Sequence, residues 1–340
     1  MRARPALLAA AAGILLVVSG CGEAGSSTGA QPETSDEATE AAPDAAALPS
    51  CEPIAGDALV VLEDDKLLQT VDNIIPAVNA AAAAASPGLV AVLDAASATL
   101  DTATLVDLNK AVDIDRQTSS DVAAQYLQEA GLDEQEAVGN GTPVVVGAAN
   151  FSESATLAEV YAGALRAAGF EASTQTIGNR ETYEPALESG DLTVVPEYVG
   201  TLTEFLNKKI NGADATPLAS PDLDATTEQL TLLGEGLGLV FGQPAAAQDQ
   251  NAFAVTQAFA DEYEVSTLSE LAEACGDISL GGPPECPERS FCQPGLEEMY
   301  GLQIGEFTSL DAGGPLTKSA LTQGTIALGL VFSSDAAFAG

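Results

Sequence analysis

The sequence contains no histidine and no tryptophan. Without histidine, the chain cannot build a Ser-His-Asp site, a Cys-His site or a zinc site with imidazole ligands. Aromatic residues make up only 5% of the 340 residues, whereas hydrophobic residues as a whole make up 46%. We therefore expect an aliphatic core, no metal, no cofactor and no enzymatic activity, although an enzyme that uses only carboxylates stays open.

Basic residues are also scarce, with 11 Lys and Arg against 50 Asp and Glu. A nucleic acid is a poor partner for such a chain, because phosphate binding needs a basic patch. The acidity is typical of a protein kept soluble in a salty or exposed setting. The other interpretation is a mild attraction of cationic ligands, which salt screens beyond about 8–10 Å.

The first 22 residues, MRARPALLAAAAGILLVVSGCG, place two arginines before an apolar run that ends at Cys21. This pattern predicts a secretory signal over residues 1–20, which is too short and wrongly flanked for a membrane-spanning helix. The small residues before Cys21 resemble the lipobox of bacterial lipoproteins. We therefore expect a lipid on Cys21 and an extracytoplasmic protein anchored to the outer face of the cell membrane, with an ordinary signal as the alternative.

Residues 21–51 are rich in Ala, Ser, Thr, Glu and Pro and almost lack large aliphatic side chains. Such a segment cannot bury enough apolar surface to order itself. We predict a flexible acidic tether with a reach of about 30 Å.

Four further cysteines are present, and an even number in an exported chain suggests two disulfides. Three pairings are possible. Cys286 and Cys292 lie in one short loop and can close locally, which leaves Cys51 with Cys275. A metal site is the weaker alternative, because the chain has no Cys-x-x-Cys pair.

The hydrophobic pattern predicts alternating strands and helices from residue 143 onward. Residues 143–169 read as a strand, a loop and a helix that Ser152 caps, and residues 77–137 read as helices. Alternation of this kind favours a parallel sheet in each half, covered by helices. Strand-like runs at 58–63 and 326–332 place part of a core near each end of the folded chain. Two such lobes imply a cleft between them, which is the usual place for a small ligand.

Several long segments resemble the substrate-binding proteins of osmoprotectant ABC importers, which take up glycine betaine, choline, carnitine and related amines. These segments are VVVGAANFSES, IGNRETYEPALESGDLTVVPEYVGTLTEFLN, LGGPPECPER and LDAGGPLTKSALTQGTIALGLVFSSD, and the resemblance extends over residues 52–340. It implies a two-lobed α/β fold of the type II periplasmic-binding-protein kind. It also implies a monomer that delivers a small molecule to ABC permease subunits in the membrane.

The order of these segments differs from the family's order. There, a strand like LVVLEDDK, the run NIIPAV and the last helices follow VFSSD, whereas here they occupy residues 52–138. We therefore expect a circular permutation, which chains tolerate at exposed loops. The lobes would then be residues 77–245, and residues 52–76 with 246–340. The alternative is an unrelated helical domain at 52–138.

The resemblance also implies a binding site. Aromatic faces hold a trimethylammonium group, and an arginine or a helix start holds a carboxylate. Two family tyrosines are replaced, by Asp72 and Asn251, so the ligand stays open between a quaternary amine, a zwitterion and another polar solute. Core packing, helix capping and a surface ion pair are the alternatives for individual positions. The candidate residues are Asp72, Asn150, Phe151, Ser152, Glu153, Tyr198, Thr201, Gln248, Asp249, Asn251, Arg289 and Phe332.

Three functions follow from this interpretation. The first is an extracytoplasmic receptor that closes on its ligand and delivers it to a permease. The second is an enzyme with a carboxylate pair in the cleft, and the third is a ligand sensor that signals to a membrane partner. The missing histidine and the lack of a nucleophile elbow or phosphate loop favour the receptor.

Overall fold

The computed structural model describes residues 48–338. The predicted signal, the predicted lipidation site Cys21, nearly all of the predicted tether and Gly340 lie outside these residues. Within them, no single helix is long and apolar enough to cross a membrane. The helices α2 (Leu89–Ser97) and α3 (Thr102–Asp113) reach that length only as a pair, which is bent by 89°.

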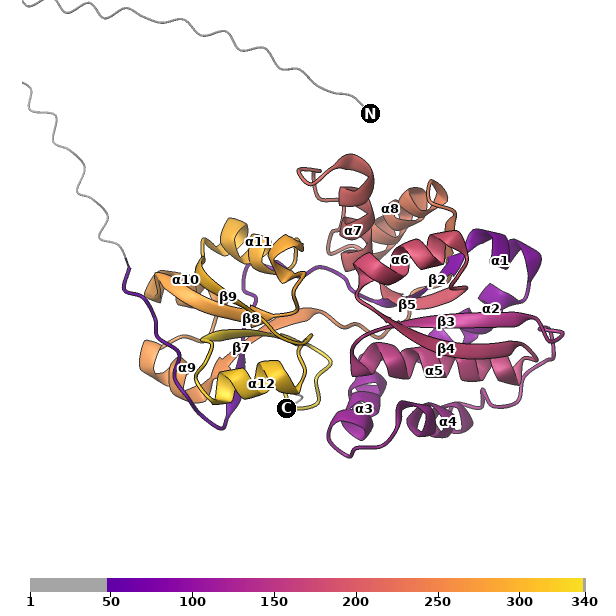
Figure 1. Ribbon diagram of the computed structural model, residues 1–340, viewed down its shortest axis with the longest axis horizontal. Coiled ribbons are helices and arrows are strands. Elements are labelled where there is room, and N and C mark those ends of the chain that lie inside the picture. Colours follow the sequence, from indigo (N-terminus) through magenta and orange to yellow (C-terminus); the bar gives the residue numbers. More distant parts are fainter. Residues whose placement is uncertain (1–47, 339–340) are drawn as a thin grey trace, which may run out of the picture. The chain divides into compact units, whose positions relative to one another are not determined.

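The first lobe is built on a five-stranded sheet in the order β4-β3-β5-β2-β6 (Figure 1). β3 runs parallel to β4 and β5, whereas β2 runs antiparallel to β5 and β6. The prediction of a purely parallel sheet was therefore wrong, because β2 enters the sheet from the opposite direction. The strands are β2 (Ile74–Asn79), β3 (Pro143–Ala149), β4 (Glu171–Gly178), β5 (Val194–Tyr198) and β6 (Leu239–Phe241).

Helices cover both faces of this sheet, and β2 shows why. Ile74 and Val78 belong to the core under α2–α5, while Ile75 and Ala77 belong to the core under α6–α8. Successive strand residues point to opposite faces, so an uninterrupted apolar run suits a strand covered on both sides. The remaining helices are α1 (Ala80–Ala85), α4 (Ser119–Glu129), α5 (Ser152–Ala167), α6 (Arg180–Ser189), α7 (Val199–Asn211) and α8 (Leu223–Glu235).

The second lobe contains the sheet β1-β7-β10-β8-β9, which is also mixed. β8 is parallel to β9 and β10, and β7 is antiparallel to both β1 and β10. Its strands are β1 (Leu59–Leu62), β7 (Asn251–Thr256), β8 (Asp277–Gly282), β9 (Gln303–Ser309) and β10 (Leu328–Phe332). Its helices are α9 (Gln257–Tyr263), α10 (Leu268–Ala274), α11 (Gln293–Gly295) and α12 (Pro315–Thr322), with a 3₁₀ turn at Cys286–Glu288 and a π turn at Leu296–Tyr300.

The two core strands near the ends of the folded chain therefore meet in one sheet. β1 pairs with one edge of β7 and β10 pairs with the other. The start of the folded chain also contacts α12, because the Gly56 amide donates to the Thr322 carbonyl at 3.1 Å. Segments far apart in the sequence thus form one core.

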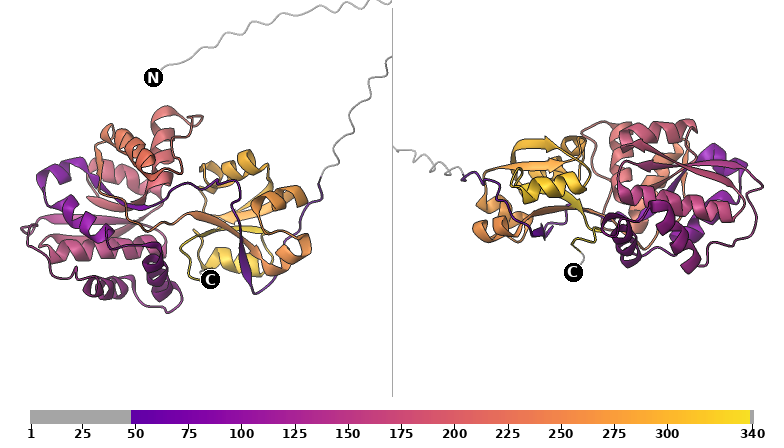
Figure 2. Two further views of the ribbon diagram at one scale, coloured as in Figure 1. Left: turned by 180° about the vertical axis from the view of Figure 1, so that it is seen from behind. Right: turned by 60° about the horizontal axis from the view of Figure 1, so that its bottom comes forward.

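Two segments connect the lobes, one between β1 and β2 and the other between β6 and β7 (Figure 2). They run side by side, since the Asp249 amide donates to the Asp72 carbonyl at 3.1 Å and Asn73 bridges to Gln248. The boundary predicted between residues 76 and 77 falls inside β2, so residues 74–76 belong to the sheet of the first lobe.

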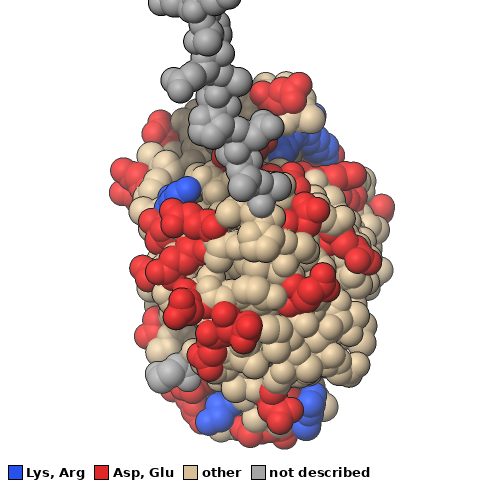
Figure 3. All heavy atoms as spheres, turned by 90° about the vertical axis from the view of Figure 1, so that its left-hand side faces the viewer, with Lys and Arg blue, Asp and Glu red and all other residues tan. Residues whose placement is uncertain are grey.

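Both predicted disulfides are present. Cys51 is bonded to Cys275, which joins the segment before β1 to the end of α10. Cys286 is bonded to Cys292, six positions further along the chain, and closes a short loop that faces the first lobe. The end of the second lobe shown in Figure 3 carries many more acidic than basic side chains, as the composition predicts.

Candidate functional site

A cavity of about 740 Å³ lies between the two lobes. Its first-lobe wall comes from the carboxyl ends of β3 and β5 and from α6 and α7, and its second-lobe wall comes mainly from the disulfide loop and β10. Nine of the twelve candidate residues line it. They are Asp72, Asn150, Phe151, Tyr198, Thr201, Asp249, Asn251, Arg289 and Phe332.

Three aromatic rings form an apolar part of this wall. The rings of Phe151 and Tyr198 are stacked with centroids 6.4 Å apart, and the rings of Phe151 and Phe332 are tilted with centroids 5.5 Å apart. Phe151 precedes α5, Tyr198 ends β5 and Phe332 ends β10. Strand ends of both lobes thus bring together rings that are distant in the sequence.

Glu153 lies behind this wall and links the lobes. Its carboxylate accepts hydrogen bonds from the Tyr198 hydroxyl at 2.6 Å, from Asn109 Nδ2 at 2.6 Å and from the Ser334 hydroxyl at 2.6 Å. Burial raises the pKa of Glu153, and these hydrogen bonds oppose the shift. Glu153 therefore positions Tyr198 and does not line the cavity itself.

Two further carboxyl groups lie at the floor of the cavity and are almost completely buried, with 5% of Asp72 and 4% of Asp249 exposed. Asp72 accepts a hydrogen bond from the Thr201 amide at 2.9 Å, and Asp249 accepts one from the Ser334 amide at 3.0 Å. Burial raises the pKa of Asp72 from 3.8 to about 7. Burial also raises the pKa of Asp249, and the neighbouring Glu153 carboxyl adds to that shift.

Ser152 and Gln248 do not line the cavity. The prediction that Ser152 caps α5 was wrong. Ser152 is the first residue of this helix, and the N-cap position before it is occupied by Phe151, whose side chain makes no capping hydrogen bond. The Ser152 hydroxyl donates instead to Asp113 at 3.0 Å. The Gln248 amide donates to the Thr102 hydroxyl at 3.1 Å, on the side of the crossing segment that faces α3.

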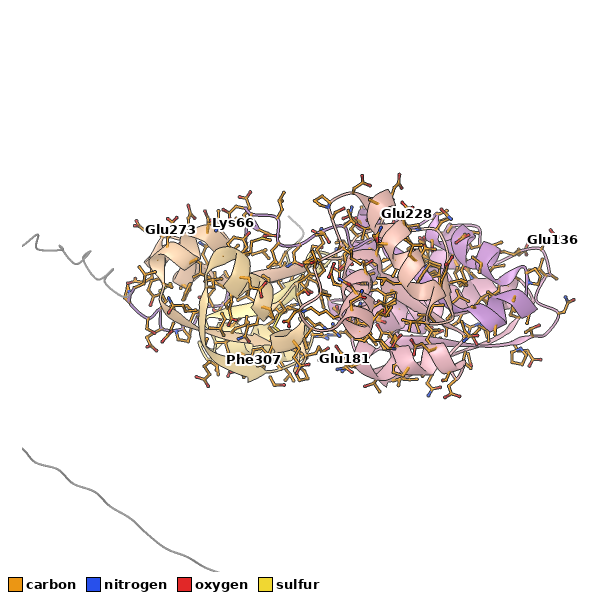
Figure 4. The ribbon with its side chains drawn as sticks, turned by 90° about the horizontal axis from the view of Figure 1, so that it is seen from above. Lys66, Glu136, Glu181, Glu228, Glu273 and Phe307 are labelled. Carbon is orange, nitrogen blue, oxygen red and sulfur yellow. A yellow bond between two sulfur atoms is a disulfide. The ribbon has the colours of Figure 1, made fainter. Side chains whose placement is uncertain are left out.

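Arg289 lines the cavity, but two acidic side chains hold its guanidinium. Arg289 lies 3.0 Å from Glu181 of the first lobe and 3.5 Å from Glu285 of its own loop. Glu181 lies where the first lobe faces the second (Figure 4). Lys208 also crosses the cavity mouth, because its ammonium donates to the Glu288 carbonyl at 3.4 Å. Arg289 thus connects the lobes at the mouth of the cavity.

The sequence argument missed Arg180, the first residue of α6. Its guanidinium makes a two-fold contact with Glu197 at 2.9 and 2.7 Å and also donates to the Thr201 hydroxyl at 2.9 Å. Burial lowers the pKa of Arg180, but the attraction of Glu197, Tyr183 and Asp72 and the hydrogen bond to Glu197 together raise it well above its ordinary value. An arginine that follows a strand and starts a helix was a usable signal, since ligand sites in α/β sheets lie at strand ends.

One face of α7 was missed as well. Thr201, Glu204, Phe205 and Lys208 are spaced three, four and seven residues apart and all line the cavity. That spacing places side chains on one face of a helix. The helical period was the available signal, because Thr201 was already a candidate.

Comparison with known families shows to which family the chain belongs. A family model described as the substrate-binding domain of ABC-type glycine betaine transport systems matches residues 23–129 and 142–340. The chain belongs to this family. The family expected from the sequence is thereby confirmed.

Two curated relatives carry glycine betaine in their names. The glycine betaine-binding protein YehZ of Escherichia coli K12 is 26% identical over 178 residues, which is 51% of this chain and 56% of that protein. The glycine-betaine-binding protein of Pseudomonas aeruginosa PAO1 is 26% identical over 179 residues, or 49% and 55%. The chain spans about half the length of the curated relatives it matches.

One solved structure also matches part of the chain. It is a crystal structure of a glycine betaine/carnitine/choline ABC transporter, 19% identical, with a TM-score of 0.36. The alignment covers 56% of this chain and 68% of that one.

Proposed function

We propose that the chain is the extracytoplasmic substrate-binding component of an ABC importer. It binds a small solute with a positively charged nitrogen, of the class that glycine betaine, choline and carnitine represent, and delivers it to permease subunits. It acts as a receptor and not as an enzyme. The observation that carries this proposal is the cavity between the lobes, which combines three aromatic rings with buried carboxyl groups.

The wall chemistry supports a cationic nitrogen. Alkylated ammonium groups are held by aromatic faces, at about 0.5–2 kcal/mol for each contact. Phe151, Tyr198 and Phe332 offer such faces, and Asp72 and Asp249 add negative charge beside them. The size of the cavity lies within the range of small-molecule sites.

The connection between the lobes supports a receptor that opens and closes. Among residues 48–338, two chain segments cross from one lobe to the other, and hinges commonly consist of a few such residues. The contacts of Arg289, Lys208 and Glu153 bridge the cavity from both sides. We propose that these contacts separate when the lobes open and form again around the ligand.

The test is a thermal-shift screen with glycine betaine, choline, carnitine, amino acids and polyamines, followed by calorimetry. A ligand that binds only the folded protein must raise its melting temperature by mass action. Binding of an amine solute at one site per chain is the expected result. A folded protein that binds none of these compounds would rule the proposal out.

We also propose that Cys21 carries a lipid, that residues 21–51 form a flexible tether and that the chain is a monomer. The tether would hold the binding lobes close to the membrane and its permease. Replacing Cys21 with Ser should move the protein from the membrane fraction to the soluble fraction. Unchanged fractionation would contradict lipidation.

The circular permutation remains a proposal, as do the lobes 77–245 and 52–76 with 246–340. Its support is that β1 and β10 pair with the same strand. A rearranged gene that moves residues 52–138 behind residue 340, through a short linker, should give a folded protein with the same ligand affinity. An aggregated product or a lost cavity would contradict the permutation.

A further inference from the structure

Three of the basic groups around the cavity form ion pairs within residues 48–338, whereas Lys208 at the mouth donates to the Glu288 carbonyl. Arg180 is held by Glu197, and Arg289 is held by Glu181 and Glu285. Lys209 is held by Glu184 and Glu188. Arginine is the usual partner of a bound carboxylate, because its planar group donates two parallel hydrogen bonds. In this arrangement no arginine of the cavity wall is available to a carboxylate on the ligand.

The two acidic groups at the floor, unlike those three basic groups, are not paired with an opposite charge within residues 48–338. Asp72 and Asp249 are at least 95% buried, line the cavity, and have no ion-pair partner in the described part of the chain. The carboxyl group of Asp72 accepts a hydrogen bond from the Thr201 amide, and the Gly200 amide is a second backbone donor beside it. A buried carboxylate without a cation is unfavourable, so a positively charged ligand would stabilise this floor.

The hydrogen bonds already made by the cavity residues restrict the ligand further. Tyr198 already donates its hydroxyl proton to Glu153, and Asn251 donates its amide to the Phe291 carbonyl at 2.9 Å. These two residues and Asp72 therefore offer oxygen acceptors and few donors. A nitrogen that keeps a hydrogen can donate to such acceptors, whereas a trimethylated nitrogen cannot.

We propose that the cavity takes a small organic ammonium ion that lacks a carboxylate and keeps at least one N–H group. Asp72 and Asp249 supply its counter-charge, and a carboxyl oxygen of Asp72 accepts its hydrogen bond. The rings of Phe151, Tyr198 and Phe332 contact its carbon atoms. This inference rests on the proposed function, since it narrows the solute that the receptor binds.

Four compounds form a matched set for the test: dimethylethanolamine, choline, dimethylglycine and glycine betaine. The first two carry a hydroxyl where the last two carry a carboxylate, and within each pair the second compound replaces N–H with a methyl group. Calorimetry on the full folded domain should show dimethylethanolamine binding tightest, at least ten-fold tighter than dimethylglycine. Choline should fall between dimethylethanolamine and glycine betaine.

Each other result has a definite meaning. Glycine betaine binding tighter than dimethylethanolamine would overturn this inference and leave the proposed function intact. Choline binding as tightly as dimethylethanolamine would overturn the role of the N–H group. A folded protein that binds none of the four compounds or the other screened amines would overturn the proposed function and this inference together.

A pair of variants tests the assigned residue. Asp72→Asn removes the floor charge with little change in shape and should weaken dimethylethanolamine binding more than ten-fold. The matched control is Glu136→Gln, an exposed acid that Figure 4 shows at the end of the first lobe remote from the second. The control should bind as the parent does. Equal affinities for the parent and Asp72→Asn, with both proteins folded by circular dichroism, would overturn the assignment.

Discussion

The floor and the mouth of the cavity handle charge in different ways. The floor contains two buried carboxyl groups, from Asp72 and Asp249, beside the buried ion pair of Arg180 and Glu197. At the mouth, Arg289 lies between two acidic side chains and is partly exposed to solvent. Arg289 at the mouth is thus balanced by the protein itself, whereas Asp72 and Asp249 at the floor have no ion-pair partner within residues 48–338. The difference supports the proposal that the floor holds the ligand, while the ion pairs at the mouth connect the lobes.

The largest expected effect comes from the one ion pair at the floor. Arg180→Met leaves Glu197 buried without its cation and should lower the free energy of unfolding by about 3–5 kcal/mol. Urea denaturation at pH 7 measures this change. The control is Arg180→Met combined with Glu197→Leu, which should recover much of the loss. A loss below about 1 kcal/mol for the single variant would contradict the difference between floor and mouth.

The next effect is a pH dependence of stability. Because the folded protein raises the pKa of Asp72 from 3.8 to about 7, ionisation is harder in the folded state than in the unfolded state. The stability associated with this group is fully present below pH 3.8 and is lost as the pH rises through about 7. Asp72→Asn should therefore be more stable than the parent at pH 8, by roughly 2–4 kcal/mol.

Urea denaturation between pH 4 and pH 8 tests this prediction. The difference between Asp72→Asn and the parent should shrink as the pH falls toward 4. Parallel pH profiles for the two proteins would show that Asp72 ionises normally at the floor.

The third effect concerns ligand affinity at the aromatic wall. Tyr198→Ala removes one ring face and should cost about 1–2 kcal/mol of binding free energy, or about ten-fold in affinity. Tyr198→Phe keeps the ring but loses the hydrogen bond to Glu153, so it separates stacking from positioning. Calorimetry with the tightest amine measures both. Parental affinity in Tyr198→Ala would mean that the ring does not contact the ligand.

The smallest effect is expected at the mouth. Arg289→Ala removes a partly exposed ion pair and should lower the free energy of unfolding by about 0.2–1 kcal/mol, with less effect at high salt. It should leave the affinity for dimethylethanolamine unchanged or slightly raised, because a like charge is removed. A large loss of glycine betaine affinity would instead identify Arg289 as a carboxylate clamp and contradict the inference above.

The sequence predicted the fold more completely than the site. The strands and helices between residues 143 and 198 follow from local signals, such as the apolar run 144–149 and the stop at Gly169. The direction of β2 does not follow from local signals. β2 is antiparallel to its neighbours because of the long connection through α1–α4, which no local pattern specifies. The residues of β2 are apolar on both faces of the sheet, and such a strand can be parallel or antiparallel to its neighbours.

The site was predicted where a residue's position along a strand or a motif identified it, as for Tyr198. It was not predicted where two lobes meet. Arg289 was expected to bind a carboxylate, and only the fold brings Glu181 to its guanidinium from a position 108 residues away. The sequence also could not predict that Asp72 has no ion-pair partner among the described residues, because this depends on which acidic side chains the nearby arginines contact in the folded protein.

The disulfide between Cys51 and Cys275 has a mechanical consequence. It lies where the predicted tether reaches the folded chain, before β1 begins. A pull on residues ahead of Cys51 is passed through the sulfur atoms to Cys275, at the end of α10. β1, which follows Cys51 in the chain and forms an edge of its sheet, therefore bears no tension and cannot be peeled away while the bond is intact.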